Sequence, residues 1–363
     1  MLLNISTFLA DQSERGVTME SLPPHGKPAE RELTAAELAK IDHLLPEHLE
    51  ATAVRLAAEI SADEDVITYG ISTEALGFFL GYEWTVANVF GQYTGASSEY
   101  RSGREFLKSE TFRDSNSRLR HAVRVTRLAE CLFNLQLVPG IKHRVAMLKI
   151  DNLETALGEM ECAALFTHPD LKLRFIVPGG TKGQDYEAEI VTPAGTVVCC
   201  EIKTKKETTN LSHNTIRSTL DKARKQLPKS KPGLVVLKIP EPWTAQRRSR
   251  AIVLAAVAQV LRQSNRLVAI VLAWEDWFFV GGGCRVAYKF EPFFNKQIAL
   301  YSEEIEKALG MAGGLRNPDH VSFRTIANRA LLRSKAATNK ASVGGAEAPD
   351  QPPAAQSPPD HHS

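Results

Sequence analysis

The stretch that decides the fold runs from Phe175 to Lys205 and reads FIVPGGTKGQDYEAEIVTPAGTVVCCEIKTK. Three short segments with apolar residues, at 175–177, 185–190 and 196–202, are separated by turns rich in proline and glycine. Segments of this length between such turns are typical of β-strands. We therefore predict three neighbouring strands, the last two of which form a hairpin.

Strand geometry groups the charged residues of this stretch, because side chains at positions i and i+2 lie on one face of a strand. Glu201 and Lys203 are therefore expected to point the same way, while Ile202 points into the core. If the hairpin pairs Asp185 near Glu201, two carboxylates and one ammonium group meet at one edge of the sheet. The acids of the preceding segment also share a face, and they are Asp185, Glu187 and Glu189.

Two carboxylates beside a lysine suit a hard divalent cation. Mg²⁺ keeps several waters and binds through one or two protein carboxylates together with substrate phosphate. The ion lowers the pKa of a bound water, and a nearby lysine can position or deprotonate that water. The residue types therefore predict a metal site for phosphate chemistry.

This pattern resembles the PD-(D/E)xK phosphodiesterase superfamily, which includes restriction endonucleases and Holliday-junction resolvases. The resemblance rests on Asp185, followed after sixteen residues by Glu201-x-Lys203. It extends over about residues 150–300, through an upstream helix at 159–166, a downstream basic helix at 218–227 and a strand at 233–239. It implies an α/β fold with a restriction-endonuclease-like core, in which a central mixed sheet is flanked by helices.

The resemblance also implies roles for individual residues. Asp185 and Glu201 would hold Mg²⁺ or Mn²⁺ together with the backbone carbonyl of Ile202. Lys203 would orient the attacking water and stabilise the charge that develops on phosphorus. Glu159, which fits the spacing of its helix better than Glu161 does, would hold a second metal ion or a water.

The chain departs from the family pattern at two points. Gln184 stands where the family motif has its proline. Glu187 or Glu189 could also take the place of Asp185 as the metal ligand. A surface hairpin with acids on its wet face is the structural alternative, although the segment from Val197 to Ile202 is very apolar for an exposed edge.

The remaining chain divides by composition into further regions. Its 363 residues predict roughly two domains. Residues 1–32 are expected to be poorly ordered, and 33–150 to be helical, beginning with a capping box at 34–37. The nuclease-like core covers 151–300. C-terminal helices are expected at 301–335 and a disordered tail at 336–363, where alanine, proline and serine dominate.

Local charge, rather than the net charge of +2, predicts contacts with nucleic acid. Nine basic and two acidic residues lie between Lys203 and Lys231. A ridge of arginines with helical spacing precedes the core, and a solvated face is the alternative interpretation of both features. The expected phosphate contacts are Lys205, Lys206, Lys222, Lys225, Gln226, Arg120, Arg124 and Arg127.

Other classes of function find no support. The sequence has no Gly-x-Ser-x-Gly elbow, no phosphate-binding P-loop, no His-Glu-x-x-His and no dinucleotide fingerprint. The five cysteines lack metal-ligand spacing, and a reducing, cytoplasmic location is expected. The longest apolar run, at 251–261, is too short to span a bilayer, so no membrane association is expected.

The sequence therefore predicts a metal-dependent nuclease whose expected partner is DNA, with a homodimer left open. The first alternative is a binding module that keeps the nuclease fold but does not cut. A second is an unrelated helical scaffold in which Glu-x-Lys occurs by accident. A pure binding module should have no metal site, so binding of a divalent cation would argue against the first alternative. A central mixed sheet would argue against the second alternative.

Overall fold

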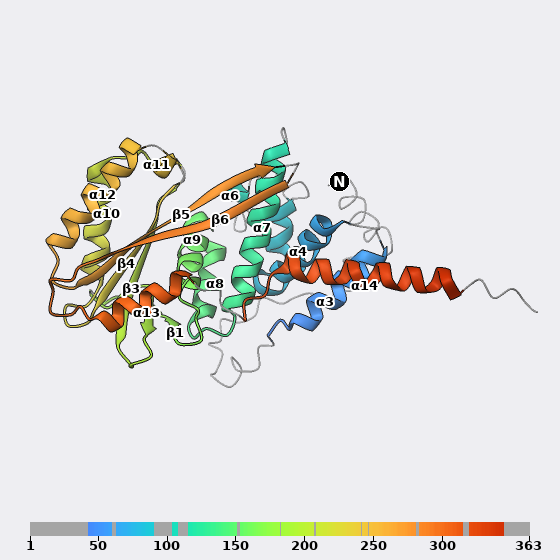
Figure 1. Ribbon diagram of the computed structural model, residues 1–363, viewed down its shortest axis with the longest axis horizontal. Helices are drawn as coiled ribbons and strands as arrows, with labels where there is room; N and C mark the ends of the chain where they lie inside the picture. The colour runs from blue at the N-terminus through green and yellow to red at the C-terminus, as the bar shows by residue number, and fades with distance from the viewer. Residues whose placement is uncertain are drawn as a thin grey trace, which may run out of the picture.

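The protein folds into one mixed six-stranded sheet with helices on both faces, seen in a computed structural model (Figure 1). The structure describes residues 43–344, apart from 60–62, 91–103, 108–114, 151–152, 182, 207, 241, 246, 281–282 and 315–318. The expected disordered segment at 1–32 and the capping box at 34–37 lie outside this part. The α/β class and the central mixed sheet are confirmed, which excludes a purely helical scaffold.

The strands follow one another across the sheet in sequence order. The first three form an antiparallel meander, the third, fourth and fifth run parallel, and the sixth returns antiparallel. Parallel neighbours need helical crossovers, which α10 (His213–Gln226) and α12 (Arg247–Arg262) supply. The strands are β1 (Lys172–Phe175), β2 (Ala188–Val191), β3 (Val197–Thr204), β4 (Gly233–Lys238), β5 (Leu267–Val280) and β6 (Gly283–Phe294).

Two of the three strands predicted from the opening stretch differ from the expectation. The first apolar segment, 175–177, only touches the end of β1, which lies mostly upstream. The second strand begins at Ala188, so 185–187 precedes it. The third agrees well with β3, and Gly195, at φ 85°, forms the turn between β2 and β3. The late start of β2 decides which acid faces Glu201.

Both faces of the sheet are covered, which explains the almost continuous apolar sequences of β4 and β5. On one face, Val235 and Leu237 pack against Leu220 of α10 and Val257 of α12. On the other face lie α8 (Ile141–Ile150) and α9 (Leu153–Ala164), as Figure 1 shows. The hydrophobic core between the sheet and these two helices continues into the core of the helical region.

The helical region also includes the last helix of the chain. Helix α14 (Phe323–Gly344) packs against α3 (Pro46–Glu59) and α4 (Glu64–Leu80), far from it in sequence (Figure 1). The prediction of a disordered tail from 336 onward is therefore wrong for residues 336–344, which belong to α14. The alanines of this segment favour a helix. The remaining helical elements are α5 (Tyr82–Thr85), the π-helical turn Val86–Phe90, α6 (Arg104–Leu107), α7 (Ser115–Leu135), α11 (Pro242–Ala245) and α13 (Glu303–Gly314).

No helix within the described ranges combines the length and the apolar character needed to cross a bilayer.

Candidate active site

The candidate site lies where β2 and β3 part. Their pairing ends at Ala188 and Cys200, whereas β3 continues beside β4 as far as Thr204. The next pair in the same register is Glu187 and Glu201, which therefore face each other just beyond the last paired residues. Glu201 is fully buried. We call Glu159, Glu187, Glu201 and Lys203 the acid site.

The carboxylate of Glu201 is held mainly by charge. The ammonium group of Lys203 forms an ion pair with its Oε1. Apart from this ammonium group, the carboxylate has no hydrogen-bond donor among the residues that the structure describes. A buried carboxylate normally accepts several hydrogen bonds, and an unsatisfied one is costly. This arrangement leaves acceptor positions open for a cation.

Burial and like charges disfavour ionisation at this site. Burial raises the pKa of Glu201 to about 7, and Glu187 adds to the effect while Lys203 opposes it. Burial also raises the pKa of Glu159 to about 8, reinforced by Glu187 and Glu201. Burial opposes the charge on Lys203, but Glu201 and Glu187 outweigh it and raise the pKa of Lys203. The site is therefore a concentration of acids that attracts positive charge.

Glu187, rather than Asp185, is the acid that the structure brings to Glu201. The carboxylate of Asp185 accepts a hydrogen bond of 2.9 Å from the backbone N–H of Gly179. Its backbone carbonyl accepts one of 3.2 Å from the side chain of Gln226. Because the hairpin pairs Ala188 with Cys200, the register assigns Glu187 to the position opposite Glu201. Counting outward from the turn at Gly195 would have found this.

Glu189 serves a structural purpose on the same segment. Its carboxylate accepts hydrogen bonds of 2.6 Å from Nε of Arg174 and 2.6 Å from the hydroxyl of Tyr186. Although burial acts in the opposite direction, these partners lower the pKa of Glu189. Among the three acids of this segment, only Glu187 is thus left for the acid site.

A close contact between α9 and the sheet positions Glu159. Gly158 lies so near the end of β3 that a Cβ atom there would be 2.7 Å from Oγ1 of Thr204 and 3.1 Å from Cδ of Lys238. Glycine is therefore needed at this position. The neighbouring Leu157 and Met160 are buried. Glu159 stands one residue beyond Gly158 and acts electrostatically on the site.

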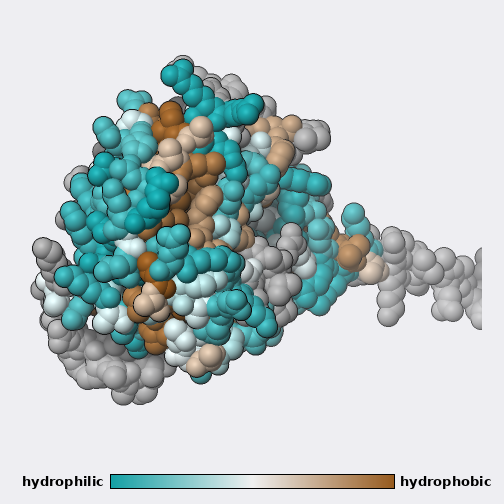
Figure 2. Space-filling model, turned by 60° about the vertical axis from the view of Figure 1, so that its left-hand side comes forward, coloured by the Kyte–Doolittle hydropathy of each residue, from teal (hydrophilic) through white to brown (hydrophobic). Residues whose placement is uncertain are grey.

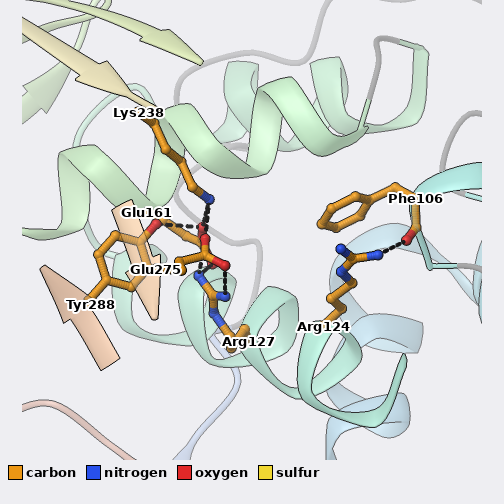
Figure 3. A network of polar contacts seen from close by, with 7 residues as sticks. All are labelled: Phe106, Arg124, Arg127, Glu161, Lys238, Glu275 and Tyr288. Carbon is orange, nitrogen blue, oxygen red and sulfur yellow. Dashed lines mark hydrogen bonds and ion pairs between the residues drawn. The ribbon is translucent and has the colours of Figure 1, made fainter. Parts of the chain in front are cut away.

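Two of the three ridge arginines make internal contacts (Figure 3). Arg124 is only 6% exposed, and it donates a hydrogen bond of 2.8 Å to the carbonyl of Phe106. Arg127 forms ion pairs with Glu161 and Glu275. The expected phosphate-contact ridge is therefore not an open surface, because these guanidinium groups already have acceptors inside the protein.

Arg120, the third ridge residue, packs on aromatic rings. Its guanidinium lies 5.4 Å from the ring centre of Trp277 and 5.4 Å from that of Phe279. Both rings belong to the part of β5 that pairs only with β6 and extends toward α7 (Figure 1). Cation–π contacts of this kind hold a hairpin against a helix.

A buried polar network joins the helical region to the sheet (Figure 3). We call it the buried network, and it consists of Arg127, Glu161, Lys238, Glu275 and Tyr288. Lys238 Nζ lies 2.8 Å from Glu161 and 2.5 Å from Glu275, and the hydroxyl of Tyr288 donates to Glu161 at 2.7 Å. Two cations balance two anions, which suits a structural role. Glu161 belongs to this buried network, whereas Glu159, two residues earlier on α9, acts on Glu201.

The lysines expected to contact phosphate lie on α10 and just after β3. Lys206, Lys222 and Lys225 are exposed, and Lys205 is partly buried. Burial lowers the pKa of Lys205, and the positive charge of Lys222 contributes. Figure 2 turns the side that bears α10 and α12 forward and shows a mostly hydrophilic surface with an apolar band across it. Gln226 is engaged by Asp185, as described above.

Sequence reasoning missed Arg144 of α8. Its Nη2 forms an ion pair with the carboxylate of Glu187, and also donates to the backbone carbonyls of Glu187 at 3.2 Å and Ile176 at 3.4 Å. The side chain is 12% exposed. No motif marks this residue, because its acceptors lie 32 and 43 positions away in the chain.

The donor set can be compared with what a divalent cation needs. In the part of the chain that the structure covers, no three His, Cys, Asp or Glu side chains are arranged as a ready metal cage. Glu201, whose Oε2 has no donor among the described residues, and Glu187 opposite it nevertheless match the one or two carboxylates that Mg²⁺ takes.

Comparisons with protein-family models, with curated proteins and with solved structures find no match to this chain.

Proposed function

We propose that this protein is a metal-dependent nuclease that hydrolyses phosphodiester bonds, with DNA as its expected substrate. The observation that carries the proposal is the fully buried Glu201, whose carboxylate lies opposite Glu187 and has Lys203 as its one donor among the described residues. A protein that only needed stability would replace or satisfy such a group. Perturbed acids of this kind gather at functional sites.

The topology supports a restriction-endonuclease-like core. Helix α9 precedes an antiparallel meander of three strands, and α10 then leads to β4, which is parallel to β3. This order is the one that the resemblance of residues 150–300 implies. Glu201 and Lys203 lie at the end of the third strand, beside the strand that follows the crossover.

In this proposal Glu187 takes the role first expected of Asp185. Glu201 and Glu187 would hold Mg²⁺ or Mn²⁺ with the backbone carbonyl of Ile202, and Glu159 would hold a second ion or a water. A bound divalent ion supplies an activated water and offsets phosphate charge. Lys203 orients that water and stabilises the charge developing on phosphorus.

The lysines that follow β3 and those of α10 would supply the substrate surface. Lys205 and Lys206 come just after the end of β3 at Thr204, and Lys222 and Lys225 are exposed on α10. Lysine contacts to phosphate are independent of sequence and weaken as salt rises. They would hold a nucleic-acid backbone beside the acid site.

The test is cleavage of plasmid DNA, a short duplex and a single-stranded RNA with Mg²⁺ or Mn²⁺. Glu201→Gln, Glu187→Gln and Lys203→Ala are expected to lose cleavage, while Asp185→Asn, the matched control, retains it. Circular dichroism checks that each variant is folded. Unchanged cleavage in Glu201→Gln, purified in the same way, would refute the proposal.

A second candidate is a nucleic-acid-binding module that keeps the fold without cutting. The pairing of Arg144 with Glu187 favours it, because a guanidinium group already neutralises one proposed ligand. Calorimetry with Mn²⁺ in the absence of substrate separates the two: the nuclease binds the ion through Glu201, and the binding module does not.

A further inference from the structure

Arg144 brings a positive charge into the acid site from the helical region. It lies on α8, and its guanidinium contacts both the carboxylate and the backbone carbonyl of Glu187. Burial raises the pKa of both Glu159 and Glu201, and the charge of Arg144 acts against this by favouring their ionised forms. Arg144 therefore influences all three acids of the site.

The start of α8 is fixed against the sheet at the end of β1. The N–H of Phe175 donates a hydrogen bond of 2.8 Å to the carbonyl of Pro139. Gly140 has φ 84°, and a Cβ atom there would lie 2.3 Å from the carbonyl oxygen of Phe175. The guanidinium of Arg144 lies 5.8 Å from the ring centre of Phe175. The position of Arg144 is thus built into the fold.

The charges explain why an arginine is there. Glu159, Glu187 and Glu201 are three carboxylates, and Lys203 alone cannot balance them. Like charges at close range in a partly buried site repel strongly. A second cation relieves this repulsion when no other cation is bound, and the fork of a guanidinium fits carboxylate and carbonyl acceptors together.

We propose that Arg144 is a built-in counter-ion of the acid site, which competes with a divalent cation for Glu187. The inference rests on the proposed function, since it assumes that Glu187 and Glu201 form a metal site. A cation arriving at this site meets the charge of Arg144, and Glu187 must release the guanidinium before its carboxylate can act as a ligand. The helical region thereby sets the affinity for metal.

The competition makes a prediction opposite to that of a purely structural arginine. Removing the charge of Arg144 tightens binding of Mn²⁺ by at least about ten-fold, because a repelling unit charge is lost near the ion. A residue that merely held Glu187 in place would weaken binding when removed. Arg144→Lys retains the charge and is expected to bind Mn²⁺ with an affinity close to that of the unmodified protein.

The experiment is calorimetric titration of the full chain with Mn²⁺, without nucleic acid. Arg144→Gln is the main variant, and Arg144→Met, which keeps the aliphatic stem over Phe175, replaces it if glutamine prevents folding. Arg174→Gln is the matched control, because Arg174 pairs with Glu189, which lies two residues beyond Glu187 but outside the acid site. The melting temperature is measured with and without Mn²⁺ as a second readout.

The expected result is tighter binding and a larger Mn²⁺-induced rise in melting temperature for Arg144→Gln, with Arg174→Gln unchanged. Equal or weaker binding in Arg144→Gln would overturn the inference. Glu201→Gln separates a failure of this inference from a failure of the proposed function. Loss of Mn²⁺ binding in Glu201→Gln supports the metal site, whichever result Arg144→Gln gives. Binding retained in Glu201→Gln would remove the metal site itself, and the inference with it.

Discussion

Replacing Glu201 with glutamine should stabilise the metal-free protein at alkaline pH. The wild-type carboxylate is fully buried, and Lys203 is its one donor in the described structure, so its ionisation carries a cost that glutamine avoids. Glutamine has nearly the same shape and leaves the packing in place. The effect isolates the charge of one side chain.

The magnitude follows from the pKa of Glu201, which burial raises from 4.5 to about 7. The folded state therefore binds the proton more tightly than the unfolded state does, and stability falls as pH rises between these two values. At about 1.4 kcal/mol for each pKa unit, the cost is about 3 kcal/mol above pH 7. The attraction of Lys203 is already part of this pKa, so glutamine should gain about 3 kcal/mol at pH 8.

Urea unfolding with EDTA at pH 5 and pH 8 measures this directly. Glu201→Gln should be more stable than the wild type at pH 8, and the difference should shrink at pH 5. Glu189→Gln is the control of opposite sign, because its partners lower the pKa of Glu189 and its charge stabilises the fold at pH 8. If Glu201→Gln is less stable than the wild type at pH 8, the reasoning about an unsatisfied buried charge is refuted.

Three further predictions concern the supports of the site. Lys238→Met should destabilise the fold by about 3–5 kcal/mol in urea unfolding, because one cation then faces two buried carboxylates; a loss below about 1 kcal/mol would contradict this. Gly158→Ala should lower the free energy of unfolding by about 1–3 kcal/mol, because its Cβ atom pushes α9 away from β3. Gly179→Ala should change the stability little, because a Cβ atom at this position has no other atom within 4 Å. Lys222→Ala combined with Lys225→Ala should reduce the salt dependence of DNA binding by about two counter-ions, measured by fluorescence anisotropy, and an unchanged slope would place the substrate elsewhere.

The mixed sheet could be predicted because the signals for its strands are local. Glycine or proline stands on at least one side of the apolar segments of β3, β4 and β5, and burial on both faces makes these segments continuous. The pair Glu201 and Lys203 follows from strand periodicity alone. The preference for Glu159 over Glu161 follows from helix spacing, whereas the need for glycine at position 158 is seen only in the structure.

The identity of the second acid could not be settled by spacing to a motif. Asp185 and Glu187 lie on the same predicted face, and only the register of the hairpin distinguishes them. A shift of the pairing register by two residues keeps each side chain on the same face of the sheet but changes the residue opposite it. The motif resemblance favoured Asp185, whereas the register fixed by the turn favours Glu187.

The arginines show where sequence reasoning fails for a different reason. The helical spacing of Arg120, Arg124 and Arg127 indicated a ridge, but their partners come from distant parts of the chain. Glu275, for example, is 148 positions from Arg127. Arg144 is the converse case, since nothing near it in sequence reveals that it meets Glu187. Contacts between remote charges are a property of the folded arrangement.

The most direct test of the account is crystallography of the protein soaked with Mn²⁺, using the anomalous signal to locate the ion. The account predicts a peak bound by Glu201 and Glu187, with the guanidinium of Arg144 moved away from Glu187. A protein that binds Mn²⁺ at Asp185, or shows no peak near Glu201 at saturating Mn²⁺, would contradict it.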